Sequence, residues 1–159
     1  MADKDKRIVY QGDDGRAVVV IPAPNFLAEG GTLNDVMNKC VPISGKSTAD
    51  IVDKSEILSD RTFRNAWVTE KGKSTEVDLS KAKDVAKEKV REARTPKFQE
   101  LDIAYQRADE DSDTDAKKAV ADKKKVLRDA TANSKITDAS DVAKLKEGME
   151  AVIKEVNDL

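Results

Sequence analysis

The stretch VDLSKAKDVAKEKVREAR, residues 77–94, marks the point at which the character of the sequence changes. Before it lie most of the turn-forming residues and several short runs of β-branched residues. After it come about eighty residues rich in Ala, Lys, Asp and Glu, interrupted only by Pro96 and Gly148. We therefore predict an α+β fold with two parts, a small β-containing N-terminal unit over residues 1–79 and a helical region over residues 80–159.

The first two helices of the helical region are expected on either side of a proline. Ser80 is a good N-cap for a helix over residues 80–94. Pro96 is tolerated at the first position of a helix and disfavours helical backbone in the residue before it. We therefore expect a break at this proline and a new helix over residues 96–109.

An acidic segment, DEDSDTD, follows the second helix and is expected to form a turn. Thr114 or Asp115 can cap a third helix over residues 115–130. Two helices joined by a short turn form an antiparallel pair. The sequence therefore predicts a helical hairpin in the middle of this region.

The C-terminal segment has an amphipathic pattern that predicts a helix over residues 141–157, with Ser140 as its cap. Its apolar residues are spaced by three and four positions, which is the seam of a heptad repeat: Val142, Leu145, Met149, Val152, Val156 and Leu159. Gly148 should weaken this helix by about 1 kcal/mol. The seam packs either within the chain, on the helical hairpin, or on a partner or a second copy.

The N-terminal unit carries signals for strands and for one short helix. RIVYQ and RAVVVIP flank GDDG and predict a β-hairpin, and ADIVD predicts a further strand. In TLNDVMNKC, Thr32 and Asp35 have the spacing of a capping box at the start of a helix. RNAWVTE and TEVDL, separated by KGKS, predict a second hairpin.

Phe63 and Trp67 in SDRTFRNAWV are four residues apart, and Trp67 is the only tryptophan. On a helical turn the two rings would share one face, with Arg61 and Arg64 beside them. They are either a core anchor of the N-terminal unit or an exposed aromatic surface for binding a protein partner.

The motif that suggests nucleotide chemistry does not satisfy its requirements. Gly45-Lys46-Ser47 ends like a phosphate-binding loop, but the position five residues before Gly45 is Cys40 instead of glycine. Pro42 also removes one of the N–H donors that phosphates need, and no amphipathic helix follows. We interpret this segment as a polar connector and expect no nucleotide or other cofactor.

Other catalytic and metal-binding patterns are also incomplete. The alternating acids from Asp109 to Asp115 lack the glycine and the final glutamate of a calcium-binding loop. The sequence contains no histidine, and Cys40 is its only cysteine, so a Cys–His pair cannot form. We expect no metal site, no catalytic residues and no small-molecule substrate.

Charge and hydropathy argue against two classes of partner. The 29 basic and 31 acidic residues leave a net charge of −2, and neither half of the chain is a basic block, so nucleic acid is not expected. No run of about 18 apolar residues is present to cross a membrane. The charged N-terminus, MADKDKRIVY, does not have the pattern of a signal peptide, and we expect a cytoplasmic protein.

Several segments together resemble small phage and prophage proteins that are encoded near tail genes, a group similar in layout to tail-fibre assembly proteins. The resemblance covers most of residues 7–146. It rests on the Asp-Arg-Thr-Phe-Arg-x-Ala-Trp signature (residues 60–67), the Asp-Leu-x-Lys-Ala entry into a helix (residues 78–82) and the Arg128-Asp129 helix end.

The resemblance implies a non-enzymatic tail accessory protein, a chaperone-like protein that binds a tail-fibre or baseplate component during assembly in the host cytoplasm and can remain in the virion. The alternative is a permanent minor structural protein of the tail, baseplate or neck that forms homo-oligomers through its helices. The residues proposed for partner binding are Phe63, Trp67, Val142, Leu145, Met149, Val152 and Val156.

Overall fold

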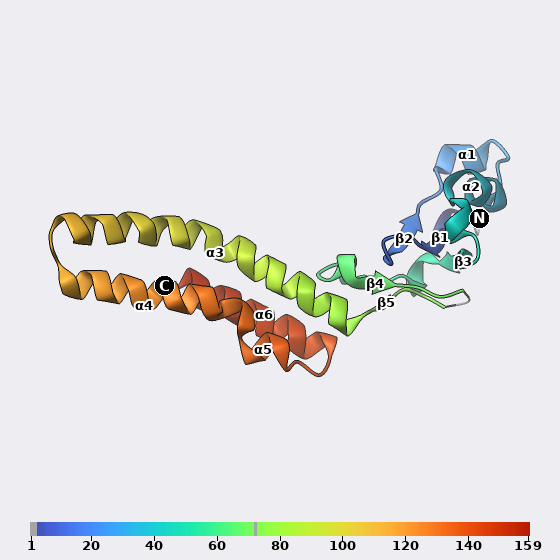
Figure 1. The fold of residues 1–159 in the computed structure, drawn as a ribbon. Coiled ribbons are helices and arrows are strands. Elements are labelled where there is room, and N and C mark those ends of the chain that lie inside the picture. Colours follow the sequence, from blue (N-terminus) through green and yellow to red (C-terminus); the bar gives the residue numbers. More distant parts are fainter. Residues whose placement is uncertain (1–2, 72) are drawn as a thin grey trace. The chain divides into compact units, whose positions relative to one another are not determined.

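The computed structural model describes residues 3–71 and 73–159 (Figure 1). The chain divides into two compact units, Met1–Asp78 and Leu79–Leu159. Helices account for 62% of the structure and strands for 12%, with the sheets in the first unit and the long helices in the second, which confirms the predicted α+β class.

The N-terminal unit is built on a three-stranded antiparallel sheet with the order β2-β1-β3. Its strands are β1 (Lys6–Gln11), β2 (Ala17–Val20) and β3 (Asp50–Asp53). Val9 in the central strand pairs with Val19 of β2 and with Asp50 of β3. The first predicted hairpin and the additional strand are therefore confirmed.

Two short helices lie between β2 and β3, α1 (Pro24–Ala28) and α2 (Leu33–Cys40). The start of α2 confirms the predicted capping box: Thr32 Oγ1 accepts from the Asp35 N–H at 3.2 Å, and Asp35 Oδ2 accepts from the Thr32 N–H at 2.9 Å. The hydrogen bond from the Thr32 hydroxyl is the main cause that lowers the pKa of Asp35 below its ordinary value.

One face of the sheet and the two helices form an apolar core. Its buried members are Ile8, Tyr10, Val36, Val41 and Ala49, and the half-buried side chains packed on it are Val18, Val20, Phe26, Met37 and Ile51. These residues come from all three strands, from both helices and from the segments beside them, so the unit builds its own core although it contains few large side chains.

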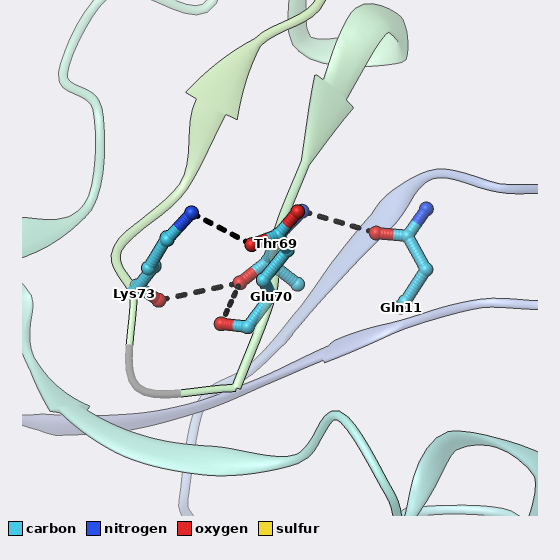
Figure 2. Close-up of polar contacts among 4 residues, drawn as sticks. All are labelled: Gln11, Thr69, Glu70 and Lys73. Carbon is cyan, nitrogen blue, oxygen red and sulfur yellow. Dashed lines mark hydrogen bonds and ion pairs between the residues drawn. The ribbon is translucent and has the colours of Figure 1, made fainter.

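The second predicted hairpin is also present, with two residues in each strand: β4 (Trp67–Val68) pairs with β5 (Glu76–Val77). Part of its turn, Gly72, lies outside the described residues. A hydrogen bond joins the hairpin to β1: the Thr69 N–H donates to Gln11 Oε1 at 3.0 Å (Figure 2). Lys73 Nζ is 2.7 Å from Glu70 Oε2, and this hydrogen bond lowers the pKa of Glu70 and raises that of Lys73.

The described residues also form five short 3₁₀ turns: Asp3–Asp5, Ile43–Gly45, Lys54–Glu56, Arg64–Ala66 and Ala130–Ala132.

The helical unit begins with α3 (Leu79–Glu110), which runs without interruption through Pro96. The predicted break at this proline, with separate helices over 80–94 and 96–109, was wrong. Pro96 is exposed and so is Glu92, whose carbonyl loses its intrahelical donor. Packing of α3 on α4 and α6 outweighs the local cost of the proline.

The turn after α3 confirms the predicted helical hairpin. The N–H groups of Ser112 and Asp113 donate to the carbonyls of Asp109 and Ala108, and Ser112 has a φ of 55°, as in a Schellman motif. The next helix, α4 (Thr114–Asp129), is capped by Asp113, which accepts from the Ala116 N–H at 2.9 Å. The cap therefore lies one residue before Thr114 and two before Asp115, the two predicted caps.

The chain ends with α5 (Ser134–Thr137), which the sequence did not predict, and α6 (Val142–Asn157). The cap of α6 is Asp141 instead of the predicted Ser140, because Asp141 Oδ1 accepts from the Lys144 N–H at 2.8 Å. That main-chain donor is the main cause that lowers the pKa of Asp141.

Within the helical unit, α4 runs back along α3, and α6 packs beside α3 (Figure 1). The core face of α3 carries Ala82, Ala86 and Val90, each 0% exposed, at a spacing of four residues. Two of these three side chains are alanines, which take up little space at the contact of α3 with its neighbours. Leu127 of α4 and Ile136 of α5, also 0% exposed, complete this core.

Candidate protein-binding groove

The residues proposed from the sequence for partner binding lie mainly in the interiors of the two units. On α6, Leu145, Met149, Val152 and Val156 are at most 4% exposed, and Val142 is half-buried. Helix α6 packs on α3 and α5 of the same unit. The structure therefore favours the intrachain alternative for this seam, because the buried side chains would reach a partner only if the helix moved.

Phe63 and Trp67 lie in the N-terminal unit and are 2% and 1% exposed. They do not share a helical face, because residues Arg64–Ala66 form a 3₁₀ turn and Trp67 begins β4. The indole N–H of Trp67 has no acceptor among the described residues. Their burial favours a core anchor over an exposed aromatic surface, and they belong to a different unit from the α6 residues.

An open groove in the N-terminal unit offers a more accessible apolar surface. It has a volume of about 340 Å³ and lies between the end of β2, α1 and α2. It is lined by Val20, Ile21, Pro22, Ala23, Phe26, Val36, Lys39 and Cys40. Ile21 is the most exposed of the large apolar side chains in this lining, at 63%.

The wall that Phe26 forms is held in place by the end of α1. Gly30 has a φ of +92°, and the N–H groups of Gly30 and Gly31 donate to the carbonyls of Leu27 and Phe26. A Cβ atom at Gly31 would lie 2.3 Å from the Phe26 ring, so glycine is required there for the ring to pack against the main chain.

Lys39 is the only charged residue in the groove lining. Its ammonium group lies 5.4 Å from the centre of the Phe26 ring, a cation–π distance. The nearby Asp35 is engaged in the capping box of α2. The groove can therefore receive one or two apolar side chains, with Lys39 at hand for an acidic neighbour.

The lining supplies little for catalysis. Cys40 is exposed and is the only thiol, and the chain has no histidine to activate it. The other lining side chains, apart from Lys39, are hydrocarbon. This arrangement suits binding of an apolar segment.

The sequence contains a compositional signal for this groove, outside any recognised motif. Residues 17–28, AVVVIPAPNFLA, form twelve consecutive uncharged residues in a chain of which 38% is charged. This run supplies five of the eight lining residues. The other three come from α2, and only the fold brings them beside the run.

The segments that the sequence suggested for phosphate or calcium have structural roles. Residues Ile43–Gly45 form a 3₁₀ turn, and Thr48 accepts from the Gln11 N–H and donates to the Gly45 carbonyl. Among the acids, Asp113 caps α4 and Asp109 pairs with Lys117. Over residues 3–71 and 73–159, no group of three potential metal ligands comes together.

Comparisons with protein-family models, with curated proteins and with solved structures find no match for this chain. Across the part of the chain that the structure describes, no helix combines the length and the apolar character needed to cross a lipid bilayer.

Proposed function

We propose that this chain is a non-enzymatic phage tail accessory protein that binds a tail-fibre or baseplate component during assembly in the host cytoplasm. The groove between β2, α1 and α2 is the binding site for an apolar segment of that component. The observation that carries the proposal is the apolar lining of this groove, in which the Ile21 side chain is 63% exposed. A chaperone-like protein needs such a surface to cover apolar residues of an unassembled subunit.

The signature that resembles the tail proteins has a structural role in this fold. Asp60 Oδ1 accepts from the main-chain N–H of Thr62 at 2.9 Å, and the Asp78 N–H donates to the Ala66 carbonyl at 3.0 Å. Phe63 and Trp67 are buried. The signature thus describes how the N-terminal unit folds, and the groove is a separate surface of the same unit.

Co-expression with phage tail-fibre and baseplate proteins tests the proposal. The wild-type chain should co-purify with a fibre or baseplate protein. Cys40→Arg places a long, charged side chain at an exposed position in the groove, and we expect it to reduce affinity about tenfold or more. Ile43→Arg is the matched control, because Ile43 is 89% exposed and does not line the groove.

Three results would count against the proposal. The first is that the wild-type chain binds none of the tail proteins. The second is that Cys40→Arg and Ile43→Arg lose binding equally. The third is that fibre protein expressed without this chain is already soluble and trimeric. A stoichiometric copy in purified virions, measured by mass spectrometry, would instead favour the permanent structural subunit.

A further inference from the structure

The two edges of the three-stranded sheet differ in how their main-chain groups are satisfied. Gly12 donates to the Arg16 carbonyl at 2.8 Å across the β1–β2 hairpin. Bonded pairs alternate with non-bonded pairs in an antiparallel ladder. Counting from the bonded pair Gly12–Arg16, the pairs Gln11–Ala17 and Val9–Val19 are non-bonded. The N–H and C=O groups of Ala17 and Val19 therefore point away from β1, toward the outside of the sheet.

The outer edge of β3 is closed by carboxylates. By the same alternation, the N–H groups of Ile51 and Asp53 point outward. The Ile51 N–H donates to Asp50 Oδ1 at 2.8 Å, and the Asp53 N–H donates to Glu56 Oε2 at 2.7 Å. This edge has no outward donor left for another strand, and its acidic side chains are the kind of charge that discourages strand pairing.

The outer edge of β2 is open. Among the described residues, no hydrogen bond involves the main-chain groups of Ala17, Val19 or Ile21. No charged side chain occurs from Ala17 to Ala28. Pro22 does not close the edge either. The main-chain groups of Val18 and Val20 face β1, and Pro22 continues this alternation, so its missing N–H would also face β1. An uncharged edge with free main-chain donors and acceptors is a template for another strand.

The strand is complementary to itself. With a two-fold axis at Val19, Val19 pairs with Val19 of the second copy and Ala17 pairs with Ile21. Val19 and Ala17 are the residues of β2 whose main-chain groups face outward, so the central Val19 pair can exchange two hydrogen bonds. Ile21 is the first residue after β2 and would extend the ladder opposite Ala17. The most exposed side chain of this segment, Ile21, would lie opposite the smallest, Ala17, and Arg16 would lie opposite Pro22. No like charges face each other in this register.

We propose that two copies of this chain associate through an antiparallel β2–β2 pair, which joins the two sheets into one six-stranded sheet. The pairing surface is a single short strand and is smaller than a standard interface, so the dimer is weak. The dimer does not depend on the groove being a partner-binding site.

Sedimentation velocity of the full chain tests the dimer over concentrations of about 10–500 µM, the range in which weak interfaces associate. The wild type should shift from monomer to dimer across this range. Val19→Lys and Val19→Asp each place two like charges directly opposite each other, and each variant alone should remain monomeric. An equimolar mixture of the two variants should restore a dimer, which a folding defect could not do.

A cross-linking experiment locates the axis. Val19→Cys with Cys40→Ala places two thiols in a bonded pair with a Cα separation of about 5.5 Å, which a disulfide can span. Mild oxidation should give a covalent dimer. The control is Ile43→Cys with Cys40→Ala. Residue 43 is 89% exposed but lies outside the proposed β2–β2 pair, so this variant should cross-link at least about tenfold more slowly than the Val19→Cys variant.

The proposal is overturned if the wild type stays monomeric to the highest concentration. It is also overturned if the Lys and Asp variants dimerise as well as the wild type, or if the two cysteine variants cross-link at equal rates. None of these outcomes concerns Cys40→Arg, so the dimer and the groove can fail independently.

Discussion

The carbonyl oxygen of Lys135 lies so close to Gly148 that a Cβ atom at residue 148 would be 2.2 Å from it. Gly148 is buried where α5 crosses α6. The glycine that should weaken α6 according to its helix propensity is the residue that lets the main chain of α5 approach the helix.

Gly148→Ala should therefore destabilise the helical unit, although alanine is the better helix former. An exposed glycine replaced by alanine would gain about 1 kcal/mol. Here the added methyl group must displace the α5 main chain, and we expect a net loss of about 1–3 kcal/mol in the free energy of unfolding. Urea unfolding followed by circular dichroism measures it.

Glu150→Ala is the control for Gly148→Ala, because Glu150 is exposed on the same helix and its loss should change stability by less than about 0.5 kcal/mol. A Gly148→Ala variant that is more stable than the wild type would show that α5 does not hold its position on α6.

Local signals predicted the elements that local chemistry determines. The capping box of Thr32 and Asp35, the hairpin around GDDG and the acidic turn after α3 were all predicted from neighbouring residues. The helix break at Pro96 was wrong because contacts along both halves of α3 outweigh the preference of one residue.

The groove and the destination of the α6 seam could not be predicted in the same way. The groove joins residues 20–26 to Val36, Lys39 and Cys40, which are far apart until the sheet and helices pack. The heptad spacing of α6 shows that one face is apolar, but it does not say which surface covers that face.

Replacing Pro96 by alanine should stabilise the helical unit. Alanine restores an N–H donor to the Glu92 carbonyl and removes the clash of the proline ring with the preceding turn. Because Pro96 is exposed, no core contact is lost, and we expect a gain of about 1–3 kcal/mol in urea unfolding followed by circular dichroism. Gln99→Ala, also exposed, should change the stability by less than about 0.5 kcal/mol. If Pro96→Ala is no more stable than the wild type, the proline causes no strain in α3.

The capping carboxylates should make stability depend on pH at the acidic end. The pKa of Asp141 is lowered by the N–H of Lys144, and that of Asp35 by the hydroxyl of Thr32. A carboxyl with a lower pKa in the folded state contributes stability that is fully present above its unfolded pKa of about 3.9 and is lost as the pH falls through the folded value. The thermal midpoint should therefore fall below about pH 4.

Asp141→Asn isolates one carboxylate from the many others that titrate in this range. An asparagine oxygen can still cap α6 but does not titrate. The variant should lose less stability than the wild type between pH 5 and pH 2, with the difference confined to the range below about pH 4. Equal losses in the two proteins would mean that the cap of Asp141 contributes nothing that depends on its charge.

The single tryptophan should report the unfolding of the N-terminal unit separately from that of the helices. Trp67 is 1% exposed within that unit, so its emission should shift to longer wavelength when the unit unfolds. The long helices α3, α4 and α6 all belong to the other unit, which has its own core, so circular dichroism mainly follows that unit. We therefore expect two denaturant midpoints that do not coincide.

Leu145→Ala removes a side chain that is 0% exposed and should cost about 2–5 kcal/mol in the helical unit. The midpoint by circular dichroism should fall while the fluorescence midpoint stays in place. A single transition that both probes follow, and that Leu145→Ala shifts as a whole, would show that the two units unfold as one.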